Sequence, residues 1–298
     1  MKRLLLMTTL LLFISCQTST KTTELLRSQI EQVISDKNAI VGVSIIGNEG
    51  KDTISINGDR QFPLQSVFKF HIGLTMLSQI DAGKFSLDQK VDIPKKDLLP
   101  NLWSPLREEY PNGGSFSISK LIENAVSYSD NVACDVLLRL IGGPKVVEDY
   151  IKRNNIEDIS IKWNEEKQQA NWDLMFQNWT TPKAASATLA KFYENKIVSS
   201  KSHDFIWEIM KKTRTGANRL KGQLPKGTIV AHKTGSSGIN SEGITAAVND
   251  IGIIFLPNGK HFFISVFVTS SKENEETNEK IIADIAKTTW DYYATQTK

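Results

Sequence analysis

The sequence predicts an α/β (α+β) protein: an antiparallel five-stranded sheet, flanked by N- and C-terminal helices, with an inserted all-α domain. Two observations support this prediction. Stretches of alternating apolar residues, which are typical of strands, occur near both ends of the chain. The middle of the chain, roughly residues 60 to 212, contains mostly helical patterns. Strands at both ends indicate that the two termini build one sheet, on which helices pack.

The individual elements follow from periodicity. Apolar residues recur at helical spacing between residues 23 and 37, which predicts an amphipathic helix. A helix that opens at Ser66 and ends before Gly83 is apolar nearly all round, so we expect it to be buried. The remaining expected elements are strands at Ile40–Ile46, Thr53–Ile56, Thr228–Thr234, Gly243–Val248, Ile251–Leu256 and Phe262–Thr269, and a final helix from Glu275 to Ala294.

Composition indicates an ordinary globular protein. The chain has 298 residues, of which 40% are hydrophobic and 23% charged, and its formal charge is +3. Without residues 1–15 the balance is 34 basic against 33 acidic residues, because that segment holds two bases and no acid. This balance favours neither a nucleic acid nor an anionic surface as partner. We expect an α/β domain from residues 16–60 and 213–298, and an all-α domain at 61–212.

The N-terminus has the pattern of an export signal. Lys2 and Arg3 precede an apolar stretch that is too short to span a bilayer permanently, so residues 1–15 are expected to be a signal peptide. Residues 13–16 also resemble a bacterial lipoprotein cleavage box, which would make Cys16 the acylated residue; a bystander cysteine is the open alternative. Both predict a periplasmic protein, either free or anchored through lipid. Cys134 is expected to be an unpaired, buried apolar residue.

Three short motifs carry the chemistry. Ser66-Val67-Phe68-Lys69, Ser129-Asp130-Asn131 and Lys233-Thr234-Gly235 occur in that order, far apart in the chain. Each alone is common, and a second Ser-x-x-Lys tetrad stands at Ser117–Lys120. The ordered set of three is much harder to meet by chance.

The first motif predicts an activated nucleophile. Ser66 and Lys69 lie three residues apart, so on a helix they share a face. A serine hydroxyl needs a base, and a buried lysine beside a second ammonium, here Lys233, favours the uncharged amine that could serve. The backbone N–H groups of Ser66 and Ser236 are candidates for stabilising a developing oxyanion.

The other two motifs predict a proton donor and a binding strand. Ser129 could pass a proton to a leaving nitrogen, with Lys233 beside it. Asn131 could steady the first lysine and bind a substrate amide. Lys233 and Thr234 could bind a substrate carboxylate, while Gly235 lets the backbone approach closely.

The chain resembles the class A serine β-lactamases, and within them the branch of Bacteroides-type cephalosporinases and extended-spectrum enzymes. The matching segments are residues 129–135, 142–144, 177–180 and 232–235. The resemblance implies the β-lactamase/transpeptidase-like fold, with the site between its two domains. It implies acylation of Ser66 by the β-lactam carbonyl and hydrolysis by a water that a glutamate activates. Counting thirteen residues back from Asn178 gives Glu165 for that role, and the adjacent Glu166 stays open.

Departures from the common family pattern define further expectations. Gln169 stands where many relatives carry an asparagine, and Trp163 and Asn178 stand where many have an arginine–aspartate pair. Residues 243–245 lack the arginine that the next strand often supplies, so Arg219 is the expected substitute. Trp103 matches a position that walls the substrate entrance, although a partly buried loop aromatic is the equal alternative.

The expected function is that of a periplasmic, monomeric serine β-lactamase that hydrolyses cephalosporins and penicillins without metal or organic cofactor. A penicillin-binding D,D-peptidase is the first alternative. A non-hydrolytic β-lactam-binding protein is the second. Multiple turnovers of a chromogenic cephalosporin would separate the hydrolase from both.

Overall fold

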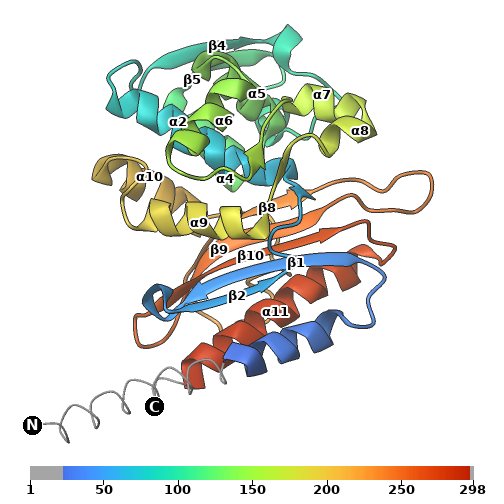
Figure 1. Cartoon of the computed structure of the whole chain (residues 1–298). Coiled ribbons are helices and arrows are strands. Elements are labelled where there is room, and N and C mark those ends of the chain that lie inside the picture. The colour runs from blue at the N-terminus through green and yellow to red at the C-terminus, as the bar shows by residue number, and fades with distance from the viewer. Residues whose placement is uncertain (1–22, 296–298) are drawn as a thin grey trace, which may run out of the picture.

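A computed structural model describes residues 23–295 of the chain, and its centre is a five-stranded antiparallel sheet (Figure 1). The strands lie in the order β2-β1-β10-β9-β8, so the two ends of the chain meet in the middle of the sheet. The predicted sheet and fold class are confirmed. The strands are β1 (Ile40–Gly47), β2 (Asp52–Ile56), β8 (Val230–Ser236), β9 (Val248–Phe255) and β10 (His261–Thr269).

One expected strand was wrong. Residues 243–247 do not form a ladder strand, and β9 begins only at Val248. Gly243 has a φ of +74°, which turns the chain, and Thr245 makes only isolated bridges to Ile239 and Ser271. The Ser237 side chain takes the place of a strand partner at the end of this segment: the backbone N–H of Ala247 donates to the Ser237 hydroxyl at 2.9 Å.

Two helices cover one face of the sheet. Residues 23–34 are helical and bury Leu26 and Ile30, and α11 (Glu275–Thr295) lies beside them with Ile282 and Ile285 buried (Figure 1). These side chains pack against apolar residues of the strands to form one core. The amphipathic patterns at both chain ends therefore predicted these helices correctly.

The helical segment covers the other face. In Figure 1, α9 (Pro182–Tyr193) and α10 (Ser200–Lys211) lie next to the sheet, with the other helices of the segment beyond them. The Ser186 hydroxyl of α9 donates to the carbonyl of Ser44 in β1 at 3.0 Å. The other elements are η1 (Asn48–Gly50), β3 (Phe62–Pro63), η2 (Gln65–Val67), α2 (Phe68–Asp81), β4 (Lys90–Pro94), η3 (Lys95–Asp97), α3 (Pro105–Glu109), β5 (Gly113–Ser117), α4 (Ile118–Ser127), α5 (Asn131–Ile141), α6 (Pro144–Arg153), β6 (Ile159–Ser160), α7 (Glu165–Ala170), α8 (Trp172–Met175) and β7 (Trp179–Thr180).

Helix α2 is central to the helical segment. Every residue from Phe68 to Leu77 is buried, as its all-round apolar sequence predicted. It packs against α4, α5, α6 and α10, and the apolar core around it continues into the sheet. The division into an α/β part (16–60 and 213–298) and an all-α part (61–212) stays a prediction.

Some expectations concern residues outside this description. The signal peptide at 1–15 and Cys16 lie outside the described residues. Cys134 lies inside them and is buried and free. Between residues 23 and 295, no helix has the length and apolar character needed to cross a membrane.

Candidate active site

Ser66 lies in a short 3-10 turn, η2, rather than in the first turn of α2. The turn begins at Gln65, whose φ of +44° is uncommon for a residue with a side chain. Gly235 of β8 packs directly against this turn: a Cβ on Gly235 would lie 2.6 Å from the carbonyl oxygen of Leu64. The absence of a side chain at Gly235 therefore allows β8 to lie against η2.

Lys69 joins the predicted site residues. Its Nζ is fully buried and donates to the Ser66 hydroxyl at 2.8 Å and to the Ser129 carbonyl at 2.8 Å. It also donates to the Asn131 side-chain oxygen and forms an ion pair with Glu165 at 2.8 Å. Four predicted residues from separate parts of the chain thus surround one ammonium group.

Ser129 lies between two lysines. Its φ of +59° turns the chain between α4 and α5. Lys233 Nζ donates to the Ser129 hydroxyl at 3.1 Å, and Lys69 Nζ lies 3.5 Å from the same oxygen. Complete burial lowers the pKa of Lys233 well below its ordinary value, and the neighbouring Lys69 lowers it further.

Asp130 holds the second motif in place, a role that we did not predict. It caps α5 by accepting a hydrogen bond from the backbone N–H of Ala133 at 2.8 Å. It also accepts hydrogen bonds from the Ser104 hydroxyl and from the Leu106 N–H, at 2.8 and 2.7 Å. An aspartate directly before an apolar helical run is an N-cap signal, so the sequence contained a clue.

Trp103 lies beside this motif. Its carbonyl accepts a hydrogen bond from the backbone N–H of Asn131 at 2.9 Å. Its indole N–H donates to the Tyr128 carbonyl at 3.2 Å, and 58% of the residue is exposed. Trp103 is therefore largely open to solvent next to Asn131.

Glu165, and not Glu166, faces the site. Glu165 is 3% exposed and its Oε1 lies 3.5 Å from the Ser66 hydroxyl, whereas Glu166 is exposed. The backbone N–H groups of both glutamates donate to the carboxylate of Asp135, at 2.8 and 3.0 Å. Burial, and then the nearby Glu165 charge, raise the pKa of Asp135 to about 7. Asp135 was not predicted, although it stands one helical turn after Asn131.

The neck of the loop that carries Glu165 is closed by an amide. Asn178 is fully buried, and its side-chain oxygen accepts hydrogen bonds from the N–H groups of Lys162 and Trp163, at 2.8 and 2.9 Å. Its side-chain nitrogen donates to the Trp163 carbonyl at 2.7 Å. Many relatives have an arginine–aspartate ion pair at this position. Here three hydrogen bonds of the uncharged Asn178 side chain join the two ends of the loop.

Gln169, which stands where many relatives carry an asparagine, points away from the site. It is exposed, whereas its neighbour Gln168 is 1% exposed and points toward the loop backbone. The Gln168 amide nitrogen lies 3.5 Å from the Trp163 carbonyl. On the short helix α7, the inward face is set by Glu165 and the residue three positions later, not four.

Arg219 contacts the C-terminal end of β8, the strand that carries the third motif. Its Nη2 donates to the Ser236 hydroxyl at 2.7 Å and its Nη1 to the Gly235 carbonyl at 3.1 Å. Its Nε forms an ion pair with Glu279 of α11 at 3.0 Å. The guanidinium is therefore 5% exposed and already engaged with protein groups next to Ser236. The strand that follows is β9, not residues 243–245, and β9 also lacks an arginine.

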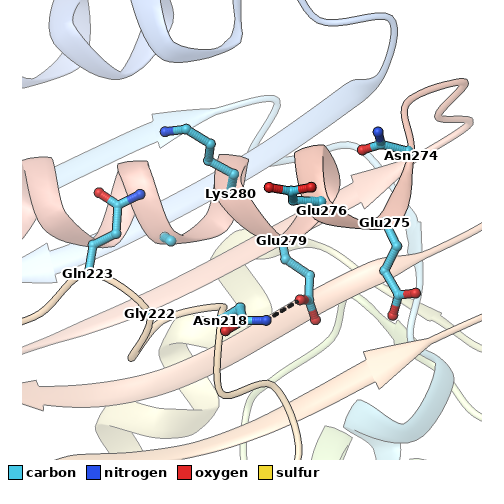
Figure 2. Close-up of a pocket in the computed structure, with 9 residues that line it drawn as sticks. Asn218, Gly222, Gln223, Asn274, Glu275, Glu276, Glu279 and Lys280 are labelled. Carbon is cyan, nitrogen blue, oxygen red and sulfur yellow. Dashed lines mark hydrogen bonds between the residues drawn. The ribbon is translucent and has the colours of Figure 1, made fainter.

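A pocket of about 820 Å³ lies between Asn218–Gln223 and the start of α11 (Figure 2). Its wall includes Asn218, which donates to Glu279 at 3.2 Å, the hydrogen bond drawn in Figure 2. None of the predicted site residues lines it. Within residues 23–295, no group of three or more His, Cys, Asp or Glu side chains is arranged to hold a metal ion.

Known proteins share this sequence and fold. A family model described as the β-lactamase enzyme family matches residues 25–293. The β-lactamase VEB-1 of Pseudomonas aeruginosa is 54% identical over 294 residues, covering 98% of this chain and 98% of its own. A β-lactamase of Bacteroides uniformis is 38% identical and covers 89% of this chain and 90% of its own length.

Solved structures agree. The TLA-3 extended-spectrum β-lactamase has a TM-score of 0.90 and 48% identity, over 91% of this chain and 99% of that chain. A class A β-lactamase from Bacteroides cellulosilyticus has a TM-score of 0.88 and 37% identity, over 92% and 99%. The chain belongs to the class A β-lactamases. It is a hydrolase that opens the amide of β-lactam rings, a resistance activity, and the predicted family and enzyme class are confirmed.

Proposed function

We propose that this β-lactamase works through an acyl-enzyme on Ser66 that a Glu165-activated water hydrolyses. The observation that carries the proposal is the position of Lys69 Nζ, which lies 2.8 Å from the Ser66 hydroxyl and 2.8 Å from the Glu165 carboxylate. One buried amine thus contacts both the nucleophile and a carboxylate that can exchange protons with it.

In the acylation step, Lys69 gives a proton to the Glu165 carboxylate, 2.8 Å away, and becomes a neutral amine. The Ser66 oxygen then attacks the β-lactam carbonyl carbon and passes its proton to Lys69. The C–N bond of the ring then breaks, and Ser129 gives its proton to the departing nitrogen. Ser129 recovers a proton from a neighbouring lysine, because its hydroxyl lies 3.1 Å from Lys233 Nζ and 3.5 Å from Lys69 Nζ. The backbone N–H groups of Ser66 and Ser236 stabilise the oxyanion.

Before the deacylation step, Glu165 returns its proton to Lys69. Glu165 then takes a proton from water as the water attacks the ester carbonyl, and it passes this proton to the Ser66 oxygen. Ser66 leaves as the alcohol and the opened acid is released. Burial of Glu165 and its contact with Ser66 support this role. The exposed Glu166 lacks both features.

Substrate binding is assigned to the edge of β8 and to the second motif. Lys233, Thr234 and Ser236 hold the substrate carboxylate beside Gly235, and the Arg219 guanidinium adds positive charge through its hydrogen bond to Ser236. Asn131 binds the substrate amide, and the exposed Trp103 ring forms a wall for the substrate side chain.

The substrates proposed are cephalosporins and penicillins. Relatives at 43% and 48% identity, PER-1 of Pseudomonas aeruginosa and TLA-3, are named extended-spectrum β-lactamases, which supports extended-spectrum cephalosporins among the substrates. In the loop that carries Glu165, the Asn178 amide closes the neck through hydrogen bonds instead of an ion pair. We connect this difference with the acceptance of cephalosporins that have bulky side chains.

The mature protein is proposed to be a periplasmic monomer that starts after residue 15, with Cys16 either acylated or free. Intact-mass spectrometry of the exported protein tests this. Loss of residues 1–15 supports export, an added lipid mass identifies Cys16 as the anchor, and retention of residues 1–15 contradicts the proposal.

The central test uses three variants and a chromogenic cephalosporin. Glu165→Gln should accumulate a long-lived acyl-enzyme, seen as a mass increment, and Ser66→Ala should form none. Glu166→Gln is the matched control and should turn over like the parent enzyme. A persistent adduct on Ser66→Ala contradicts the nucleophile, and a trapped adduct in Glu166→Gln alone contradicts the choice of Glu165.

A further inference from the structure

Asn249 is a fully buried amide on β9 that donates to the chain just before the η2 turn. Its side-chain nitrogen lies 2.8 Å from the carbonyl oxygen of Pro63 and 3.2 Å from that of Leu64. Both neighbours are acceptors, so the nitrogen of the amide, and not its oxygen, must face them. The amide oxygen is buried and has no hydrogen-bond partner among the described residues. The donating half of the side chain is therefore the half that links two elements.

The Leu64 carbonyl is the first acceptor of the η2 turn. It accepts a hydrogen bond from the backbone N–H of Val67 at 3.2 Å, which closes the turn around Ser66. The hydrogen bond from Asn249 to the same oxygen therefore fastens this turn to the sheet. The backbone N–H of Leu64 donates to the Asn178 carbonyl in the loop neck at 2.8 Å. The residue that opens the turn is thus bonded through its N–H to the loop neck and through its carbonyl to β9.

Asn249 also lies opposite the strand that carries the proposed second oxyanion donor. In the register of β8 and β9 it pairs with Gly235, the residue before Ser236. Directly paired residues of an antiparallel ladder project to the same face. The η2 turn packs on this face, because Gly235 has no side chain there and leaves room for the Leu64 carbonyl. Arg219 Nη1 fixes the backbone of the pair by donating to both carbonyls at 3.1 Å. This pair is therefore where η2, β8 and β9 meet.

We propose that Asn249 is a positioning residue for β-lactam hydrolysis. By joining η2 to β9, its side-chain nitrogen fixes the backbone N–H of Ser66 relative to that of Ser236 on the neighbouring strand. These are the two groups proposed to stabilise the oxyanion, and the inference rests on that proposal. Oxyanion donors act when they are already aimed at the developing charge, and a displacement of about 1 Å can cost about 10²-fold in rate. Asn249 is fully buried, so it acts through Ser66 rather than through a contact with substrate.

The kinetic test replaces Asn249 by leucine, which keeps the branched shape of the side chain and removes the donor. In Asn249→Leu, the acylation rate constant for a chromogenic cephalosporin, measured in a single turnover, should fall about 10- to 100-fold. The dissociation constant of the same cephalosporin, measured in the Ser66→Ala background, should be unchanged by Asn249→Leu because the β8 contacts remain. A parental acylation rate would overturn the inference. An equal weakening of cephalosporin binding would show general distortion of the site and would also overturn it.

A phenylboronic acid measures the oxyanion geometry without turnover. The Ser66 oxygen adds to its boron, and one boronate oxygen takes the place of the oxyanion, so its affinity reports binding of the transition state. The affinity should fall in Asn249→Leu by a factor similar to that of the acylation rate. An unchanged affinity would indicate a purely structural role and would overturn the inference. A boronate or acyl adduct that persists in Ser66→Ala rejects the proposed nucleophile, which is a different failure.

Asn278→Leu is the matched control. Asn278 is a fully buried amide at the start of α11, and its side-chain hydrogen bonds go to the Ser271 hydroxyl and the Glu273 carbonyl. Its variant should acylate at the parental rate, and a loss as large as that of Asn249→Leu would overturn the inference. If Asn249→Leu does not fold, Asn249→Ala removes the donor with a smaller side chain. The same 10- to 100-fold loss of acylation rate is expected there, and a parental rate would overturn the inference.

Discussion

Lys69 connects the motifs because one ammonium group has acceptors from three parts of the chain. Ser66 precedes it by one helical turn, Ser129 and Asn131 come from the start of α5, and Glu165 comes from α7. No water is needed to bridge these contacts, since each is a direct hydrogen bond or ion pair. The side chain therefore both fixes the geometry and moves protons.

Replacing this residue tests both functions. Lys69→Ala should slow acylation about 10²- to 10⁴-fold, the usual contribution of a positioned base. Pre-steady-state absorbance with a chromogenic cephalosporin measures the acylation rate. Lys167→Ala, an exposed lysine on α7, is the control and should acylate normally. An unchanged acylation rate in Lys69→Ala would exclude Lys69 as the base.

Asp135 makes stability depend on pH. Its pKa is raised to about 7 from an ordinary 3.8, so the folded state holds the proton more tightly than the unfolded state. Its stabilising contribution is therefore fully present below about pH 3.8 and is lost as pH rises from there to about 7. In Asp135→Asn, the free energy of unfolding relative to the parent should increase between pH 5 and 7, by about 2–3 kcal/mol, and should change little above pH 7. Urea unfolding at several pH values measures this, and a constant difference would refute it.

At the scale of the element, the contact between η2 and β8 sets the distance from nucleophile to binding strand. Gly235→Ala should push β8 away from η2, because its Cβ would lie 2.6 Å from the Leu64 carbonyl, and overpacking of this kind costs about 1–3 kcal/mol. We expect KM to rise more than kcat falls. Gly238→Ala is the matched control, since a Cβ there has no neighbour within 4 Å. Equal kinetics for the two variants would argue against this role of Gly235.

The loop neck is the second such element. Asn178→Ala removes three hydrogen bonds and leaves the Lys162 and Trp163 N–H groups without an acceptor, a loss of about 1–3 kcal/mol for a buried group. Because this loop carries Glu165, deacylation should slow while acylation is retained, so acyl-enzyme should accumulate in stopped-flow mixing with mass detection. Normal deacylation, together with unchanged hydrogen exchange over residues 162–178, would contradict this.

At the scale of the whole molecule, the two apolar cores lie on opposite faces of the sheet and the proposed site touches only one of them. Ile282 of α11 belongs to the far core, whereas α2 belongs to the near one. Ile282→Ala should lower the free energy of unfolding by about 2–5 kcal/mol, the range for a buried isoleucine. Its kcat/KM per folded molecule should be unchanged at low temperature. A selective loss of activity without loss of stability would show that the far face controls the site.

Periodicity in the sequence determined the sheet, the buried helix α2 and the terminal helices, because an apolar stripe reports which local face is buried. The motifs and the count back from Asn178 were enough to predict Glu165. Packing alone decided that Glu166 points to solvent, and that Gln168 rather than Gln169 turns inward. Tertiary structure also brought Asp135 of α5 against the backbone of Glu165 in α7. Such neighbours come from different elements, and local patterns carry no information about which elements meet.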